Sequence, residues 1–305
     1  MVKFSLILGK TPLHRLNYRA GDTNIYMKRD DLIPFAFGGN KVRLYEYIAP
    51  LAMSLNVNKV ITFGSLFSNH LRVTAAVCQR LGIGADLLVL TEDGQEKASI
   101  NLDLARQFNK VNVAFFKTSE AHDLIDNYLS SQKGGYLWVP GGGHMPEAVF
   151  GYIDAAKEME EQLEEMDIMP EGIFLPTGTG TTQAGLLCGL GKKCQVIGIS
   201  VARPPERCKD EISSLIDAIR GPSHRGEEKR REEIYVLEGI SYGTFSSEVR
   251  DIIVQVARTD AVWLDPIYNA PAFLKMVQYL KTHTDLKDVV YLNTGGIPNL
   301  FTTLR

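Results

Sequence analysis

The sequence lacks the patterns typical of metal-binding, secreted and membrane proteins. Its 305 residues include only four cysteines, with no Cys-x-x-Cys spacing and no matching histidine pairs, which argues against a zinc site or a disulfide framework. The apolar run near the N-terminus stops at Gly9, too early for a signal-peptide core or a membrane span. With 33 basic and 36 acidic residues, the net charge is −3. We therefore expect a cytoplasmic protein with reduced thiols that binds a small molecule, and neither nucleic acid nor a membrane.

What the sequence does contain is a regular alternation of short β-rich runs and longer segments with helical periodicity. "KVITF", "ADLLVL" and "VNVAFF" are separated by predicted helices, and "GIFLP", "QVIGIS", "VWLD" and "VVYLN" continue the series. This alternation predicts parallel sheets joined by helical crossovers. We expect an α/β protein with two open, twisted, mostly parallel sheets and helices on both faces. The predicted large domain comprises residues 1–46 and 147–305, and the small domain residues 47–146.

Ligands in such folds bind beyond the carboxyl ends of the strands, which directs attention to the loops between strands and helices. In one loop, residues 62–76, Ser68 and Asn69 could either cap the next helix or hold a carboxylate. The loop at residues 290–301 is expected to reach the same crevice, although its glycine pair alone does not distinguish a binding loop from an ordinary turn. We interpret the glycine-rich stretch "VPGGGHMPEAVFGY", residues 139–152, as a hinge between the domains rather than a wall of the site.

A further loop, "FLPTGTGTTQAGLLCGL" at residues 174–190, runs from an apolar strand through glycines and threonines into a helix. Successive N–H groups and hydroxyls at a helix N-terminus suit a phosphate monoester. The loop lacks the lysine of a Walker motif and the spacing of a dinucleotide fingerprint, which disfavours a nucleotide.

The stretch "FGGNKVRLYE", residues 37–46, puts Lys41 at the start of another predicted helix. The positive end of the helix dipole, partial burial and the nearby anion site would together push this lysine toward its neutral amine. A neutral amine is the form that condenses with an aldehyde. An activated lysine and a phosphate loop on one α/β scaffold indicate pyridoxal 5'-phosphate as the cofactor.

At these residues the sequence resembles the fold type II pyridoxal phosphate enzymes, in the branch of D-cysteine desulfhydrase and 1-aminocyclopropane-1-carboxylate deaminase. The likeness covers nearly the whole chain and rests on "TPLHRL", "YMKRDDLIPFAFGGNKVRLYE", "TFGSLFSNHLRVTAA", "PTGTGTTQAGL", "ARTDAVWLDPIY" and "NTGG". It implies a tryptophan synthase β-like fold, with the cofactor between the domains, and by analogy a homodimer.

The resemblance also implies a role for each matching residue. Lys41 matches the Schiff-base lysine and proton shuttle, and Ser68 and His70 match positions at the substrate carboxylate. The other implied cofactor contacts are Asn69 beside the ring hydroxyl, Gly178, Thr179, Gly180, Thr181 and Thr182 around the phosphate, and Thr294 facing the pyridine nitrogen. Tyr242 and Tyr268 match tyrosines near the reacting carbon and the leaving group, and the implied substrate contacts further include Asn69 and Asn269.

Departures from the family pattern bear on the substrate. Asn269 stands where the cyclopropane deaminases have glutamate and the desulfhydrases a small hydroxyl residue. Thr294 stands where the deaminases have leucine and the desulfhydrases threonine. In addition, "NAPA" after Tyr268 lacks the usual lysine, and Thr181 replaces a glycine in the phosphate loop.

We therefore expect an α,β-elimination on a small amino acid, with D-cysteine as the lead substrate giving pyruvate, sulfide and ammonia. Lys41 would remove the α-proton. A hydroxyl at Thr294 stabilises a protonated ring nitrogen less than a carboxylate would, which favours prompt loss of a β-substituent. Three alternatives stay open: ring-opening deamination of the cyclopropane amino acid, β-replacement, and a relative that binds cofactor or amino acid without turnover.

Overall fold

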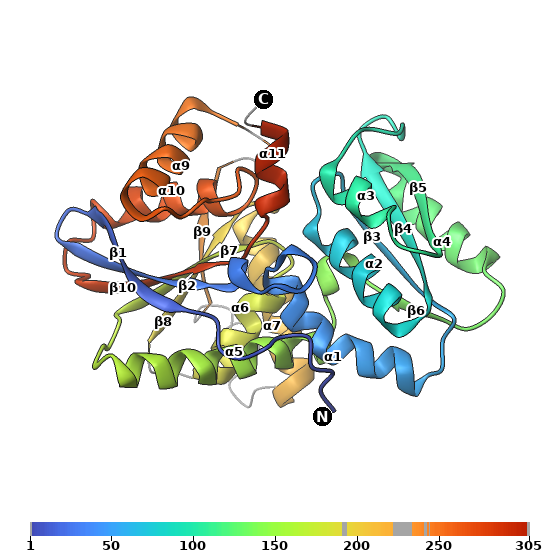
Figure 1. Cartoon of the computed structure of the whole chain (residues 1–305), viewed down its shortest axis with the longest axis horizontal. Helices are drawn as coiled ribbons and strands as arrows, with labels where there is room; N and C mark the ends of the chain where they lie inside the picture. Colours follow the sequence, from blue (N-terminus) through green and yellow to red (C-terminus); the bar gives the residue numbers. More distant parts are fainter. Residues whose placement is uncertain (1, 191–193, 222–233, 241–242, 244, 304–305) are drawn as a thin grey trace.

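The computed structural model describes residues 2–190, 194–221, 234–240, 243 and 245–303. Its strands form two separate sheets, each with its own helices, and these make two lobes that lie side by side (Figure 1). This arrangement is the predicted α/β fold with two mostly parallel sheets.

The larger sheet has six strands in the order β1-β2-β10-β7-β8-β9. Their bounds are β1 Leu13–Ala20, β2 Thr23–Arg29, β7 Gly172–Thr177, β8 Gln195–Ser200, β9 Tyr235–Glu238 and β10 Asp288–Asn293. All neighbouring pairs are parallel except β1 and β2, which form an antiparallel hairpin at the edge. Every residue of β7 is buried, as expected for a central parallel strand covered on both faces.

Helices cover both faces of this sheet. They are α5 Pro146–Glu165, α6 Thr181–Leu190, α7 Pro205–Arg220, α9 Ser247–Asp260 and α10 Asn269–Leu280, with the short α11 Leu300–Thr303 after β10. Ile173 and Leu175 of β7 pack in one core with α5 and α6, whereas Phe174 packs in a second core with α9 and α10. Figure 1 shows these two helix layers on opposite sides of the strands.

The smaller sheet has four parallel strands in the order β5-β4-β3-β6. Its elements are β3 Lys59–Ser65, α2 Asn69–Leu81, β4 Gly84–Thr91, α3 Ile100–Ala105, β5 Val111–Lys117, α4 Ala121–Ser131 and β6 Tyr136–Val139. All of them fall within the predicted small domain, residues 47–146, and the strands of the larger sheet fall outside it. The domain boundaries themselves stay a prediction.

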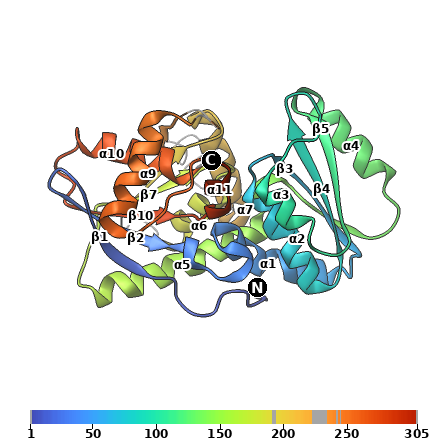
Figure 2. The same cartoon turned by 45° about the horizontal axis from the view of Figure 1, so that its top comes forward.

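Helix α1, Asn40–Ser54, joins the two lobes (Figure 2). It packs against α5 of the larger lobe and α2 of the smaller one. Residues 42–49 are all buried, which is the burial expected of a helix enclosed on every side. The start of α1 is therefore held by both halves of the molecule.

One predicted strand is absent. Residues 262–265, "VWLD", lie in neither sheet. The carboxylate of Asp265 accepts hydrogen bonds from the backbone N–H groups of Ile267, Tyr268 and Asn269, each at 2.9 Å. This capture of three successive donors turns the chain into α10 instead of letting it extend along a sheet.

The described residues contain no helix long and apolar enough to cross a membrane. In the same part of the chain, no group of three His, Cys, Asp or Glu side chains could hold a metal ion. The four cysteines are free thiols, as the sequence predicts.

Candidate active site

A cavity of about 440 Å³ lies between the two lobes and is lined by residues of both. Its walls come from the carboxyl ends of β3, β7 and β8, from the first turns of helices that follow them, and from the start of α1. The predicted site residues that line it are Lys41, Ser68, Asn69, Gly178, Thr179, Gly180, Thr181, Thr182, Tyr268 and Thr294. Loops far apart in the sequence thus converge on one cavity.

The glycines before Lys41 allow two of these loops to touch. Gly38 and Gly39 have φ of +71° and +98°, and a Cβ on Gly39 would lie 2.7 Å from the carbonyl oxygen of Thr294. The backbone N–H of Asn40 donates to that same oxygen at 3.0 Å. Side chains larger than hydrogen cannot be accommodated here, and the contact fixes Lys41 beside Thr294.

Lys41 lies in the first turn of α1, and its side chain is half-buried. Its Nζ donates a hydrogen bond to the carbonyl oxygen of Gly142 at 2.9 Å. Burial, assisted by the positive charge of Arg203, lowers the pKa of Lys41 to about 8. A useful fraction of the amine is therefore neutral near pH 7.

The stretch at residues 139–152, interpreted from the sequence as a hinge, forms part of the cavity wall. Gly141 and Gly142 line the cavity, and a Cβ on Gly142 would lie 2.7 Å from the side chain of Thr179. The glycines are therefore needed for close approach to the phosphate loop. The hinge role stays a prediction.

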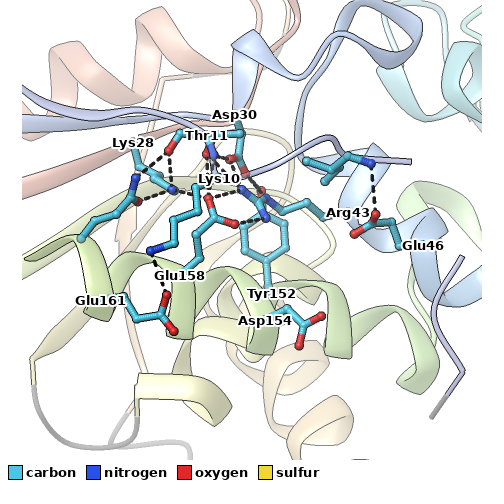
Figure 3. A network of polar contacts seen from close by, with 12 residues as sticks. Lys10, Thr11, Lys28, Asp30, Arg43, Glu46, Tyr152, Asp154, Glu158 and Glu161 are labelled. Atoms are coloured by element: carbon cyan, nitrogen blue, oxygen red, sulfur yellow. Dashed lines mark hydrogen bonds and ion pairs between the residues drawn. The ribbon is translucent and has the colours of Figure 1, made fainter. Parts of the chain in front are cut away.

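A buried network of charges anchors α1 to the larger lobe (Figure 3). Arg43, two residues after Lys41, donates two hydrogen bonds of 2.8 Å to Asp30 and one of 2.9 Å to Glu158. Burial favours protonation of Asp30, but the adjacent Arg43 outweighs it and holds the pKa of Asp30 below its usual value. The backbone carbonyl of Asp30 also accepts the N–H of Gly39 at 2.9 Å. One residue therefore holds both the lysine loop and the helix.

Residues 178–182, the predicted phosphate cradle, follow β7 and run into the first turn of α6. Gly180 has a φ of +81°, and a Cβ there would lie 2.6 Å from Ile212 of α7. Asn40 donates its side-chain N–H to the hydroxyl of Thr182 at 3.0 Å, which joins the cradle to the lysine loop. The buried hydroxyl of Thr177 has no hydrogen-bond partner among the described residues and borders the cavity.

Ser68 and Asn69 enter the cavity from the smaller lobe. Ser68 occupies the N-cap position of α2, but its hydroxyl makes no capping hydrogen bond. The side-chain oxygen of Asn69 accepts from Arg72 and from Asn101, each at 3.3 Å. Helix capping therefore does not explain Ser68, whose hydroxyl stays available to a ligand carboxylate.

Two predicted substrate contacts, His70 and Asn269, do not line the cavity. Asn269 is fully buried; its amide nitrogen donates to Asp265 at 2.7 Å and to the Gly295 carbonyl at 2.6 Å, and its oxygen accepts the Thr294 N–H at 3.0 Å. It supports the Thr294 loop from behind. Direct contact of either residue with substrate stays a prediction.

His70 is equally enclosed. Its Nε2 lies 2.8 Å from the hydroxyl of Thr62, which itself donates to the carbonyl of Val139; the hydroxyl therefore accepts, and His70 carries its proton on Nε2. Burial, with the charge of Lys41, lowers the pKa of His70 well below its usual value. Burial thus favours the neutral ring, which ties α2 to Thr62 of β3.

Tyr242 lies outside the described residues, and its predicted role stays a prediction. Sequence reasoning did not single out two arginines that line the cavity, Arg203 and Arg207. They follow β8 in the loop and first turn of α7, and Arg203 bonds to Glu211 at 3.0 Å. The signal available in the sequence was their place after a parallel strand, the same rule that identified the other loops.

The cavity fits pyridoxal phosphate on its own residues. It joins a threonine-rich cradle at a helix N-terminus, an unpartnered buried hydroxyl, nearby cations and a lysine with a lowered pKa. A family model described as "Pyridoxal-phosphate dependent enzyme" matches residues 4–295. The chain belongs to this family. As a pyridoxal-phosphate dependent enzyme it has the fold type II architecture that the sequence resemblance implies.

Relatives of this pyridoxal-phosphate dependent enzyme carry two activities in their names. A 1-aminocyclopropane-1-carboxylate deaminase of Bradyrhizobium sp. (strain BTAi1) is 29% identical over 97% of this chain and 94% of its own length. A D-cysteine desulfhydrase of Klebsiella pneumoniae is 28% identical over 98% of this chain and 95% of its own. A crystal structure of an "ACC deaminase homologue" superposes with a TM-score of 0.82 at 28% identity, covering 97% of this chain and 92% of that one.

Proposed function

We propose that this enzyme catalyses α,β-elimination on a small amino acid, with D-cysteine as the lead substrate. One water is consumed, and the products are pyruvate, ammonia and hydrogen sulfide. The observation that carries the proposal is Thr294 at the cavity wall, in a described lining that contains no carboxylate. A hydroxyl stabilises a protonated cofactor ring less than a carboxylate would, which favours expulsion of a β-substituent over a long-lived carbanion.

When bound, the cofactor withdraws electrons from the substrate α-carbon and makes its proton acidic. Lys41 is proposed to take that proton as a free amine. The lowered pKa supports this role, because a base with a pKa of about 8 is partly deprotonated at neutral pH and still basic enough to accept a proton.

Ser68 and Asn69 are proposed to hold the substrate carboxylate at the start of α2, where backbone N–H groups add to their side chains. Tyr268, which lines the cavity beside Thr294, is proposed to donate a proton or hydrogen bond to the departing sulfur. Tyr242 shares this proposed role.

Ring-opening deamination of 1-aminocyclopropane-1-carboxylate is the second candidate, favoured by the names of several relatives. The residue at position 269 weighs against it. Asn269 carries no carboxylate. Its amide nitrogen donates hydrogen bonds to Asp265 and Gly295, and its amide oxygen accepts one from Thr294. β-Replacement remains a variant of the elimination, in which a second nucleophile captures the product before hydrolysis.

The test is a product assay with the purified protein saturated with pyridoxal phosphate. D-Cysteine, L-cysteine and the cyclopropane amino acid are supplied separately, and sulfide, pyruvate and 2-oxobutyrate are measured, with Lys41→Ala as the control. Equal molar sulfide and pyruvate from D-cysteine is the expected result. Production of 2-oxobutyrate alone would overturn the proposal. We further propose a homodimer, by analogy with the family, which light scattering during gel filtration tests.

A further inference from the structure

The loop after β8 and the start of α7 run along the phosphate cradle. The N–H of Val201 donates to the Thr177 carbonyl at 3.1 Å, and the thiol of Cys208 lies 3.6 Å from the Gly178 carbonyl. Ile212 occupies the space in which a Cβ on Gly180 would sit. This segment therefore contacts the chain at Thr177, Gly178 and Gly180, from the end of β7 to the middle of the cradle.

Arg203 belongs to this segment and is tied to the cradle by a chain of three polar contacts. Arg203 pairs with Glu211 at 3.0 Å, Glu211 lies 2.8 Å from His144 Nε2, and His144 Nδ1 lies 2.8 Å from the Thr179 carbonyl. The Arg203 side chain is 23% exposed. Ordering of a long cationic side chain costs entropy, and this chain of contacts pays that cost before any ligand binds.

The charges around the cavity are unbalanced. Lys41, Arg203 and Arg207 line it, no carboxylate lines it within the described residues, and Glu211 behind the arginines offsets one positive charge. The positive charge of Arg203 also repels the protonated amine of Lys41 and helps to lower its pKa. An anion with about two negative charges, such as a phosphate monoester, would complete the balance.

We propose that Arg203, positioned by Glu211 and His144, is a binding residue for the phosphate group of the cofactor. It adds a side-chain cation to a cradle otherwise built from backbone N–H groups and threonine hydroxyls. The inference concerns the cofactor and does not depend on which amino acid the enzyme uses.

The phosphate is favoured over a substrate anion by the side of the cavity on which Arg203 lies. The residues proposed for the substrate carboxylate, Ser68 and Asn69, enter from the smaller lobe. Arg203 is instead attached to Thr179 of the cradle through His144 and Glu211.

The experiment compares pyridoxal phosphate with pyridoxal, which has the same aldehyde and no phosphate. Dissociation constants of both are measured by absorbance titration of the cofactor-free protein. For Arg203→Gln we expect binding of pyridoxal phosphate to weaken about 10-fold or more, with pyridoxal binding unchanged within about 2-fold. Arg203→Lys should recover most of the loss.

Arg207→Gln is the matched control, because Arg207 also lines the cavity but is 64% exposed and sits 3.7 Å from Glu211. We expect it to change pyridoxal phosphate affinity less than about 3-fold, since an exposed charge is screened. Circular dichroism of each cofactor-free variant verifies folding. Glu211→Gln keeps Arg203 but removes the charge of its partner, and it should weaken the binding of pyridoxal phosphate by a factor between those of Arg207→Gln and Arg203→Gln. The Arg203→Lys and Glu211→Gln variants still report on the proposal if Arg203→Gln does not fold.

Equal weakening of pyridoxal and pyridoxal phosphate by Arg203→Gln would assign Arg203 a structural role and overturn the inference. Unchanged affinity for both, with a raised KM for amino acids that carry a side-chain anion, would assign it to the substrate and overturn it as well. Neither outcome bears on the product assay that tests the proposed reaction.

Discussion

Two of the helix starts that line the cavity, those of α6 and α2, present different chemical groups to it. In the larger lobe, the loop from β7 into α6 offers backbone groups, and its shape depends on Gly180, which packs directly on Ile212. In the smaller lobe, the loop from β3 into α2 offers the side chains of Ser68 and Asn69, and the Asn69 oxygen accepts long hydrogen bonds from Arg72 and Asn101. The comparison suggests that the proposed cofactor side depends on backbone shape, to which threonine hydroxyls and Arg203 add contacts, whereas the proposed substrate side depends on side chains.

Lys41 is attached to the larger lobe, which carries the phosphate cradle. The network of Asp30, Arg43 and Glu158 holds the first turn of α1 to the larger lobe (Figure 3). Asn40 bonds to both the cradle and the Thr294 loop. A catalytic amine must stay in place while substrates change, and buried multidentate contacts provide that fixation.

The largest expected effect comes from removing the amine itself. Lys41→Ala should lower the elimination rate by about 1,000-fold or more, because both cofactor attachment and proton removal are lost. Borohydride treatment followed by mass spectrometry should label the wild type at position 41 and leave the variant unlabelled. A labelled variant would show that another lysine carries the cofactor.

The next largest effect tests the charge network that holds α1 to the larger lobe. Arg43→Met leaves the fully buried Asp30 without its main partner and should destabilise the protein by about 3–5 kcal/mol in urea unfolding. Lys10→Met is the matched control, because it removes a cation from the exposed pair with Glu161 and should change stability little. Similar stability of the two variants would contradict the assigned importance of the network.

A smaller effect separates two glycines of the cradle. Gly180→Ala should destabilise the cofactor-free protein by about 2–4 kcal/mol, because its φ is positive and its Cβ would strike Ile212. Gly178→Ala should be near neutral in the same measurement, because a Cβ there meets no atom within 4 Å. Equal losses would mean that the cradle is not shaped by its contact with α7.

The smallest expected effect is the pH dependence of the reaction of Lys41 with an aldehyde. A lowered pKa means that the neutral amine appears at lower pH, and at pH 7 about a tenth of Lys41 is neutral if its pKa is about 8. The rate at which cofactor-free protein condenses with pyridoxal should therefore rise about 10-fold from pH 7 to 9 and level off. A rate still climbing steeply above pH 9 would indicate an ordinary lysine. Arg203→Gln should move the midpoint upward.

Much of this structure was predictable from the sequence, and the failures have physical reasons. The alternation of apolar runs and helical periods predicts both sheets and most of the helices, because burial on two faces leaves a strong local signal. It gives no indication of β1, β2 or β9, whose polar residues mark sheet edges or adjoin them. The predicted strand at residues 262–265 is absent, and the Asp265 side chain at its end binds the N–H groups of Ile267, Tyr268 and Asn269 and so turns the chain directly into α10.

The sequence likewise identified some residues of the candidate site and missed others. The loops around Ser68, Gly180 and Thr294 could be identified because small polar residues follow apolar strands. Lys41 could be identified because glycines precede it at the start of a predicted helix, and the structure brings all four to one cavity. Arg203 could have been located by its place after β8, but its pairing with Glu211 could not, since an arginine and a glutamate eight residues apart give no local signal of a contact.

By itself, the sequence determined the kinds of local structure and the chemical groups delivered at the strand ends, because periodicity and glycine placement act over a few residues. Only the tertiary structure decided which groups meet. It turned Asn269 away from the cavity to support Thr294, made a cavity wall of Gly141 and Gly142, and brought Arg203 near enough to influence Lys41. Desolvation and charge act between residues distant in the chain, and their strength depends on separations in space that no local pattern records.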